Sequence, residues 1–83
     1  MTLVGYIVAN DQGEFLAGYR TLMPDVAWLA WALVPGLALT FSARTEAQQI
    51  VVREQRYPGH LAVCELWDAG TQWVVDQPED NAA

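Results

Sequence analysis

Residues 2–20, TLVGYIVANDQGEFLAGYR, decide the first half of the fold. The first eight of them are rich in β-branched and aromatic side chains and are apolar on both parities, which is typical of a β-strand. Asn10 to Gly13 then give a four-residue turn signal, in which Gly13 can adopt a positive φ. Glu14 to Arg20 predict the returning strand, with Gly18 marking a β-bulge. The stretch therefore predicts a β-hairpin.

Residues 21–36 follow this hairpin and contain two tryptophans, Trp28 and Trp31. Two interpretations fit the pattern. Pro24 can open a short helix, in which the two indoles share a face at spacing i, i+3. A loop that holds both indoles fits equally well. Pro35-Gly36 indicates a turn, after which residues 37–41 predict a third strand.

The second half of the chain predicts one helix and a second hairpin. Ser42 is expected to cap the helix, and Pro58-Gly59 to end it. Glu54 lies on its apolar side, where a carboxylate needs a partner or an exit to water. Residues 60–67 and 72–76 predict two more strands joined by a turn. The apolar stripe, which is expected to pack on a sheet, contains Ala43, Ala47, Ile50, Val51 and Tyr57.

This order, ββ-β-α-ββ, predicts an α+β fold in which one helix packs on one face of a small, mostly antiparallel sheet of about five strands. We expect a single domain over residues 1–76 and a flexible C-terminal tail over 77–83. Several strands are apolar on both parities, whereas a single helix covers one face. The second face therefore needs a cover, either from residues 21–36, from a second copy or from another molecule.

Composition gives the first indication of function. A chain of 83 residues buries only ~60–65% of its unfolded surface. Yet 53% of its residues are hydrophobic, a large share for so small a core. The chain has ten acidic residues, four arginines and no lysine, for a net charge of −6. Direct nucleic-acid binding needs cations and is disfavoured, whereas a basic protein surface suits this charge. We therefore expect a protein partner.

Few residues can carry chemistry. His60 and Cys64 lie ~13 Å apart along an extended strand, too far for a nucleophile–base pair, and they cannot complete a zinc site. Ser42 is expected to act as the helix cap. No phosphate-binding glycine loop is present. The sequence thus predicts neither an enzyme nor a cofactor or metal site.

Localisation is expected to be cytoplasmic. A single cysteine forms no intrachain disulfide, and the residues MTLVGYIVAND do not resemble a signal peptide. Residues 26–41 carry no charge but are interrupted by Pro35-Gly36 and are shorter than the ~20 apolar residues of a membrane span. Membrane association is the minor alternative.

Tryptophans and acidic residues are the candidate contacts for a partner. Tryptophan is common in interface hot spots, and Trp67 and Trp73 are expected to pack in the core instead. The acidic candidates of the second hairpin would meet a basic surface. The full candidate set is Asp25, Trp28, Trp31, Glu65, Asp68 and Asp76.

Ser42 to Gln77 resemble a family of very small phage-encoded proteins. The shared pattern is a strand ending in Phe41, a helix written EAQQIVVREQ, an aromatic at Tyr57 and a hairpin ending QWVVDQ. It is similar to a small anti-CRISPR inhibitor of the type I-F surveillance complex. The resemblance implies a phage or mobile-element inhibitor that binds Cas subunits and blocks recognition of target DNA. A self-associating structural protein, possible as a homodimer, is the alternative.

Overall fold

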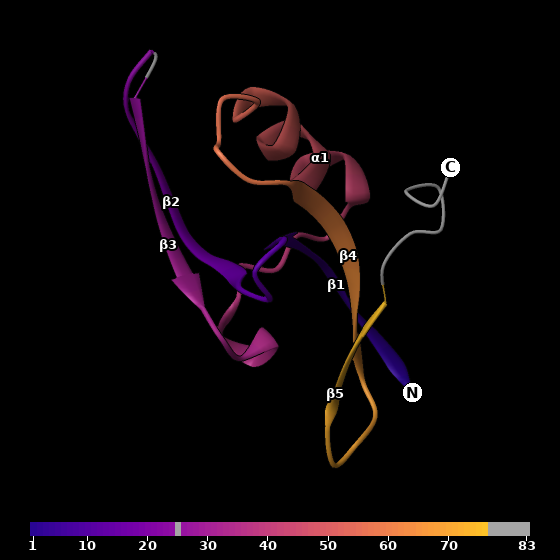
Figure 1. Cartoon of the computed structure of the whole chain (residues 1–83). Helices are drawn as coiled ribbons and strands as arrows, with labels where there is room; N and C mark the ends of the chain where they lie inside the picture. Colours follow the sequence, from indigo (N-terminus) through magenta and orange to yellow (C-terminus); the bar gives the residue numbers. More distant parts are fainter. Residues whose placement is uncertain (25, 77–83) are drawn as a thin grey trace.

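The strands form one antiparallel sheet in the order β3-β2-β1-β4-β5 (Figure 1). The computed structural model describes residues 1–24 and 26–76, so the predicted tail and Asp25 lie outside the described residues. The α+β fold class is confirmed, with five strands and one α-helix in the described part of the chain. The elements are β1 (Thr2–Asn10), β2 (Phe15–Met23), β3 (Val26–Ala32), the 3-10 helix η1 (Pro35–Leu37), α1 (Arg44–Arg53), β4 (Leu61–Asp68) and β5 (Trp73–Asp76).

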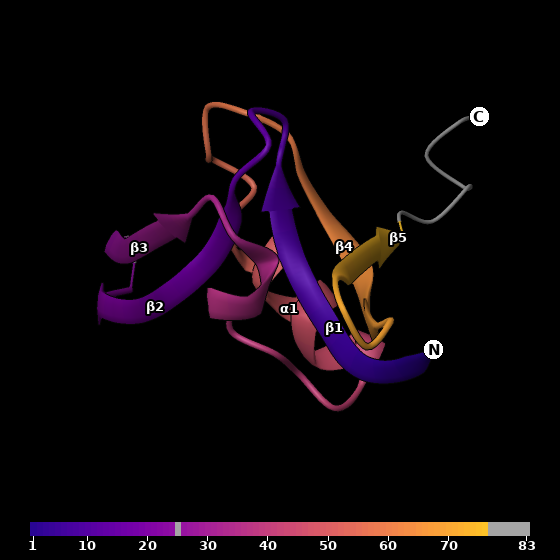
Figure 2. The same ribbon diagram turned by 90° about the horizontal axis from the view of Figure 1, so that it is seen from below.

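The sheet opens between β1 and β2. These strands pair beside their turn, where Ala9 is opposite Phe15, and then spread apart (Figure 2). Residues 38–41 enter the opening and bond to both strands. The Leu39 N–H donates to the Leu16 carbonyl over 2.9 Å, and Tyr6 and Phe41 exchange backbone hydrogen bonds of 2.9 and 2.8 Å. The sheet thus consists of a body, β1-β4-β5, and a projecting β2-β3 ribbon.

Residues 26–32 form a strand, so both the helix and the loop interpretations of this segment are wrong. Every residue from Val26 to Ala32 is paired with β2, which itself extends to Met23. The long edge of β2 provides hydrogen-bond partners that an isolated amphipathic turn lacks, and these override the helical spacing of the tryptophans. The expected bulge is present, because the register shifts between Leu16 and Gly18.

The prediction of a strand over residues 37–41 is also wrong. Pro35 to Leu37 form η1, and only Phe41 makes a β-bridge, to Tyr6. The cause is the opening of the sheet, which is wide enough for one crossing segment but gives it no continuous strand to pair with. The expected turn at Pro35-Gly36 is present as this 3-10 helix.

The helix is shorter than predicted and is capped differently. It begins at Arg44, so Ala43 rather than Ser42 is its N-cap residue. The Glu46 carboxylate accepts from the Ala43 N–H over 3.2 Å and from the Ser42 hydroxyl over 3.1 Å. The third residue of the helix therefore does the capping from within. The helix ends at Arg53, before Tyr57.

Two apolar clusters lie on opposite faces of the sheet body. The helix-side cluster joins α1 to the strands and includes buried Val8, Leu16, Ala47, Ile50, Leu61 and Val63. The far-side cluster consists of Ile7, Ala9, Cys64 and Leu66, with Phe15, Ala38 and Val75 packed against it. Both faces of the body therefore receive some cover from within the chain, the far side from Phe15, Ala38 and Val75 of β5. Over the described residues, no helix combines the length and apolar character needed to cross a membrane.

Candidate protein-binding surface

The predicted contact residues fall into two groups at opposite edges of the sheet. Trp28 and Trp31 lie on β3, which forms one edge. Glu65, Asp68 and Asp76 lie on the β4–β5 hairpin at the other edge. The structure therefore does not bring the tryptophans and the acidic residues together. Asp25 lies outside the described residues.

The two tryptophans of β3 point in opposite directions, so the prediction that they share a face is wrong. Three residues of separation means opposite sides in a strand, because successive side chains alternate. Trp31 packs into the helix-side cluster, with its ring centroid 5.4 Å from that of Tyr57. Trp28 lies against Gly18 on the outer face of the ribbon and is 52% exposed. Of the two indoles, Trp28 is the exposed one, whereas Trp31 is partly buried.

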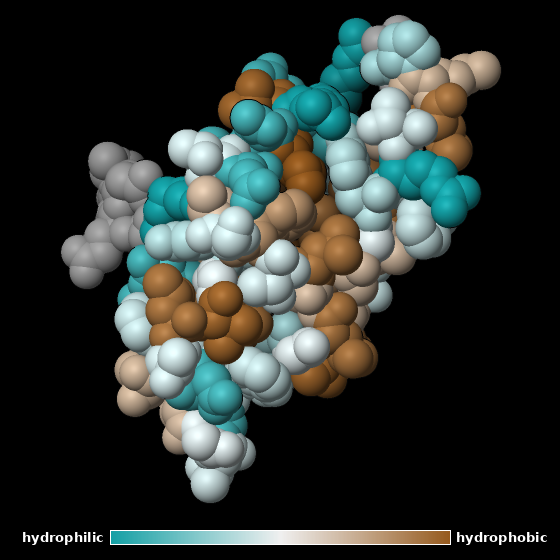
Figure 3. Space-filling model, turned by 180° about the vertical axis from the view of Figure 1, so that it is seen from behind, coloured by the Kyte–Doolittle hydropathy of each residue, from teal (hydrophilic) through white to brown (hydrophobic). Residues whose placement is uncertain are grey.

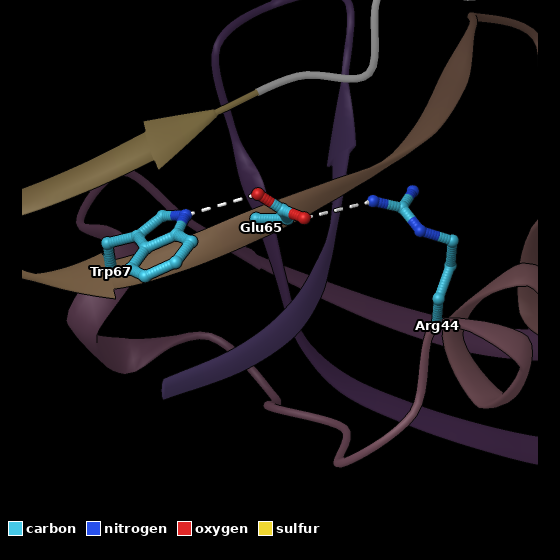
Figure 4. Close-up of polar contacts among 3 residues, drawn as sticks. All are labelled: Arg44, Glu65 and Trp67. Carbon is cyan, nitrogen blue, oxygen red and sulfur yellow. Dashed lines mark hydrogen bonds and ion pairs between the residues drawn. The ribbon is translucent and has the colours of Figure 1, made fainter. Parts of the chain in front are cut away.

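The Glu65 carboxylate already has partners within the chain (Figure 4). Its carboxylate accepts from the Trp67 indole N–H over 3.2 Å and forms an ion pair of 3.4 Å with Arg44. The Arg44 guanidinium also lies over the Tyr6 ring, 5.1 Å from its centroid. This chain of contacts fixes the start of α1 against β4 and β1. Glu65 thus contributes charge to the surface while also holding the helix in place.

Asp68 and Asp76 are exposed at the two ends of the hairpin ladder. Asp68 accepts a 2.8 Å hydrogen bond from the Gly70 N–H and so supports the turn. Asp76 lies directly opposite Glu65. Like charges directly opposite each other destabilise a sheet, and here Arg44 offsets part of that cost through Glu65. The hairpin therefore carries concentrated negative charge.

Trp73 is the functional candidate that sequence reasoning missed. It was expected in the core but is 44% exposed, on the outermost strand and opposite Asp68. Its indole rests on Gly36 of η1, where a β-carbon would come within 2.6 Å of the indole nitrogen. Its place beside a turn, on a four-residue strand at the end of the chain's last hairpin, was the available signal. Trp67 is partly buried.

Exposed aliphatic residues surround the segment that touches Trp73. Leu33 is 76%, Val34 49% and Leu37 69% exposed. Together with Trp73 they form what we call the Trp73 patch. Seen from behind, hydrophobic residues gather just above the end of the β4–β5 hairpin, with polar residues around them (Figure 3). An apolar centre with a charged border is the usual arrangement of a protein interface.

Two of the groups that could carry chemistry, Cys64 and Ser42, are buried or hydrogen-bonded within the chain. Cys64 is fully buried, and burial raises the pKa of its thiol, so the reactive thiolate is disfavoured. The Ser42 hydroxyl donates to Glu46. Within residues 1–24 and 26–76, no group of three or more His, Cys, Asp or Glu side chains is arranged to hold a metal ion.

Comparisons with known proteins give no relative: no family model, no curated protein and no solved structure matches this chain.

Proposed function

We propose that this protein binds a basic surface of another macromolecular complex through its β4–β5 hairpin and occludes that surface. The observation that carries the proposal is the exposed Trp73 patch beside the acidic residues of the hairpin. Trp73 and Leu37 supply apolar area, which provides most of the affinity of an interface. Asp68 and Asp76 supply charge, which guides encounter and favours partners of opposite sign.

The overall charge supports the same class of partner. A net charge of −6 without a single lysine is poorly suited to phosphate backbones but well suited to the grooves that hold them. Complexes that handle nucleic acid present such basic grooves. A small acidic domain seated in one of them excludes the nucleic acid by volume and by charge.

The resemblance over Ser42 to Gln77 supplies the particular target of the proposal, a type I CRISPR surveillance complex. In the structure this stretch includes α1, β4 and β5, and therefore the acidic hairpin. The protein would then be a phage or mobile-element inhibitor that works in the host cytoplasm by blocking recognition of target DNA. Its binding residues would be Glu65, Asp68, Trp73 and Asp76.

A matched pair of triple variants tests the proposal. The hairpin variant is Glu65→Gln, Asp68→Asn, Asp76→Asn, in which the new amide oxygens can still accept from the Trp67 indole N–H and the Gly70 N–H, while the ion pair with Arg44 is lost. The control variant, Asp11→Asn, Glu14→Gln, Glu46→Gln, removes the same number of negative charges at other sites and also keeps an acceptor for the bonds of Glu14 and Glu46. Each is added to a purified type I-F surveillance complex before labelled target duplex, and bound duplex is measured.

The wild type and the control variant are expected to prevent duplex binding, and the hairpin variant to lose this effect. Circular dichroism checks that both variants are folded. If the wild type in large excess leaves duplex binding unchanged, the proposed target is wrong. If both variants lose inhibition equally, total charge rather than the hairpin is responsible, and the proposed surface is wrong.

A further inference from the structure

The β3 strand is an open edge of the sheet. Its seven residues pair with β2 on one side. On the other side, no hydrogen bond reaches their backbone groups from any part of the chain that the structure describes. A row of unpaired N–H and C=O groups is a template for another strand.

The two edges of this sheet differ in how they are protected. Natural sheets shield their edges with short strands, charges, prolines or bulges. β5, the opposite edge, has four residues and ends in Asp76. β3 has seven residues, VAWLAWA, with no charge and no proline. It also belongs to the ribbon that projects from the sheet body (Figure 1). Its edge is therefore open to association.

The outer face of the ribbon adds apolar area next to this edge. Trp28 is opposite Arg20 on β2, and Leu22 lies beside them with 57% of its surface exposed. Half of the Trp28 indole is already buried on Gly18, so it is held in place before any partner arrives. A strand added at the β3 edge would contact the remaining half.

We propose that β3 pairs antiparallel with β3 of a second copy, around a two-fold axis through Leu29 and perpendicular to the sheet. In this register all seven residues are paired, each tryptophan meets an alanine, and Leu29 on the axis meets Leu29 of the second copy. Trp28 is opposite Ala30 of the second copy, and Trp31 is opposite Ala27. The pairing is self-complementary, as a two-fold interface requires.

Shifting the register by one pair in either direction removes this complementarity. Centring on Trp28 sets the two indoles directly against each other, whereas centring on Ala30 leaves two alanines opposite and places Leu29 against Trp31. The central register also keeps the faces continuous. Leu29 and Trp31 stay on the helix side of both copies, and Trp28 stays on the outer side.

The charge distribution permits this contact despite the net charge of −6. Glu65, Asp68 and Asp76 lie at the opposite edge, so they are directed away from the second copy. At the interface between the two β3 strands, neither strand has a charged residue. The acidic hairpin of each copy stays free at the two ends of the combined sheet, so the pairing is independent of the function proposed above.

Sedimentation equilibrium over a concentration series tests the proposal with a matched pair of variants. Ala30→Glu places a charge against Trp28 of the second copy, while in the single copy its carboxylate lies diagonal to Arg20. Leu37→Glu makes a comparable change at an exposed site on η1, away from β3. The wild type and Leu37→Glu are expected to form dimers. Ala30→Glu is expected to raise the dimer dissociation constant about ten-fold or more, because the new carboxylate would lose water against the Trp28 indole of the second copy.

Amide hydrogen exchange of the wild type gives a second measurement that does not depend on the variant folding. Dimer formation predicts that amides in residues 26–32 become more protected as concentration rises, while amides of β5 do not. The proposal is overturned if the wild type stays monomeric over the whole concentration series. This includes the case in which β3 pairs with an unrelated peptide strand instead. A folded Ala30→Glu variant that dimerises like the wild type also overturns it, as does growth of the wild type beyond the dimer.

Discussion

At the scale of single residues, the partner of Glu54 is decided by tertiary packing and not by the local sequence. A carboxylate on the apolar side of a helix requires a partner or access to water. The structure provides the partner: the Tyr19 hydroxyl donates to the Glu54 carboxylate over 2.7 Å. Tyr19 lies thirty-five residues earlier, on β2. Spacing along the chain carries no information about such a pair, because it depends on how α1 packs against the ribbon.

Replacing Tyr19 with phenylalanine tests the strength of this link. The variant removes the only hydrogen bond that joins α1's C-cap residue to the ribbon among the described residues. We expect a loss of about 1–2 kcal/mol in the free energy of unfolding, because the acceptor is charged and only partly buried. Urea denaturation measures it, as a lower midpoint with an unchanged slope.

Tyr57→Phe is the matched control, because the Tyr57 hydroxyl makes a longer contact of 3.3 Å with the Asn10 side chain. It should cost less than Tyr19→Phe. Equal losses in the two variants would mean that the Tyr19–Glu54 bond has no special role in joining the helix to the ribbon.

The candidate contact residues also differ in how well the local sequence predicts their surroundings. Asp76 is exposed, as the polar end of a strand usually is. Glu65 reads as the same kind of residue, but its neighbours Arg44 and Trp67 engage it. Arg44 belongs to a different element, so the ion pair was not visible in the local pattern. Trp73 was overlooked because an indole in a short apolar strand resembles a core residue.

At the scale of elements, both hairpins and the helix follow from local pattern, whereas residues 21–41 do not. The segment AWLAWA fits the helical spacing of tryptophans and, as a short continuous apolar run, also fits a buried strand. Alanine favours helices and tryptophan favours strands, so propensity gives no decision. Pairing with β2 makes the choice. Residues 37–41 have the composition of a strand, but the sheet leaves them only one bridging position, at Phe41.

Gly5→Ala tests how tightly that crossing segment is held. Gly5 is buried at a bulge in β1, and a β-carbon there would lie 2.6 Å from the Phe41 carbonyl oxygen and 2.6 Å from the Thr40 side chain. Because the first contact is with backbone, the segment must move, and we expect a loss of about 1–3 kcal/mol. Faster amide exchange at Tyr6 and Phe41 would accompany it.

Adding Thr40→Ala to Gly5→Ala separates the two contacts, because it relieves only the side-chain clash. The double variant should remain destabilised, apart from any cost of Thr40→Ala alone. Full recovery of stability would show that the carbonyl contact does not hold the segment.

At the scale of the whole molecule, the pairing of β1 with β4 decides where the surfaces lie. It puts the first hairpin and the second on either side of the centre, so β3 and β5 become opposite edges. The sequence predicts two hairpins and a helix but not this order, because strand neighbours depend on long-range contacts. The uncharged edge and the acidic edge are therefore separated. The excess of apolar residues noted in the composition appears at both, as Trp28 with Leu22 and as the Trp73 patch.

The far-side cluster gives the whole domain a pH dependence that can be measured. Burial raises the pKa of the Cys64 thiol, Arg44 lowers it and Asp76 raises it, with a net increase. As pH rises, the unfolded chain therefore loses this proton before the folded one does. Stability from the buried thiol is complete below the unfolded pKa of about 8.5 and is lost as pH rises through the folded value.

Urea denaturation of the wild type and of Cys64→Ala, between about pH 7 and about pH 10, tests this linkage. Above about pH 8.5 the free energy of unfolding of the wild type should fall more steeply than that of the variant, by up to about 1.4 kcal/mol per pH unit. Cys64→Ala is less stable at neutral pH because it leaves a cavity, so the comparison depends on the slopes and not on the absolute values. Parallel curves would mean that the thiol ionises as easily in the folded protein as in the unfolded chain. The far-side cluster would then be open to water, and the cover that Phe15, Ala38 and Val75 provide would not be tight.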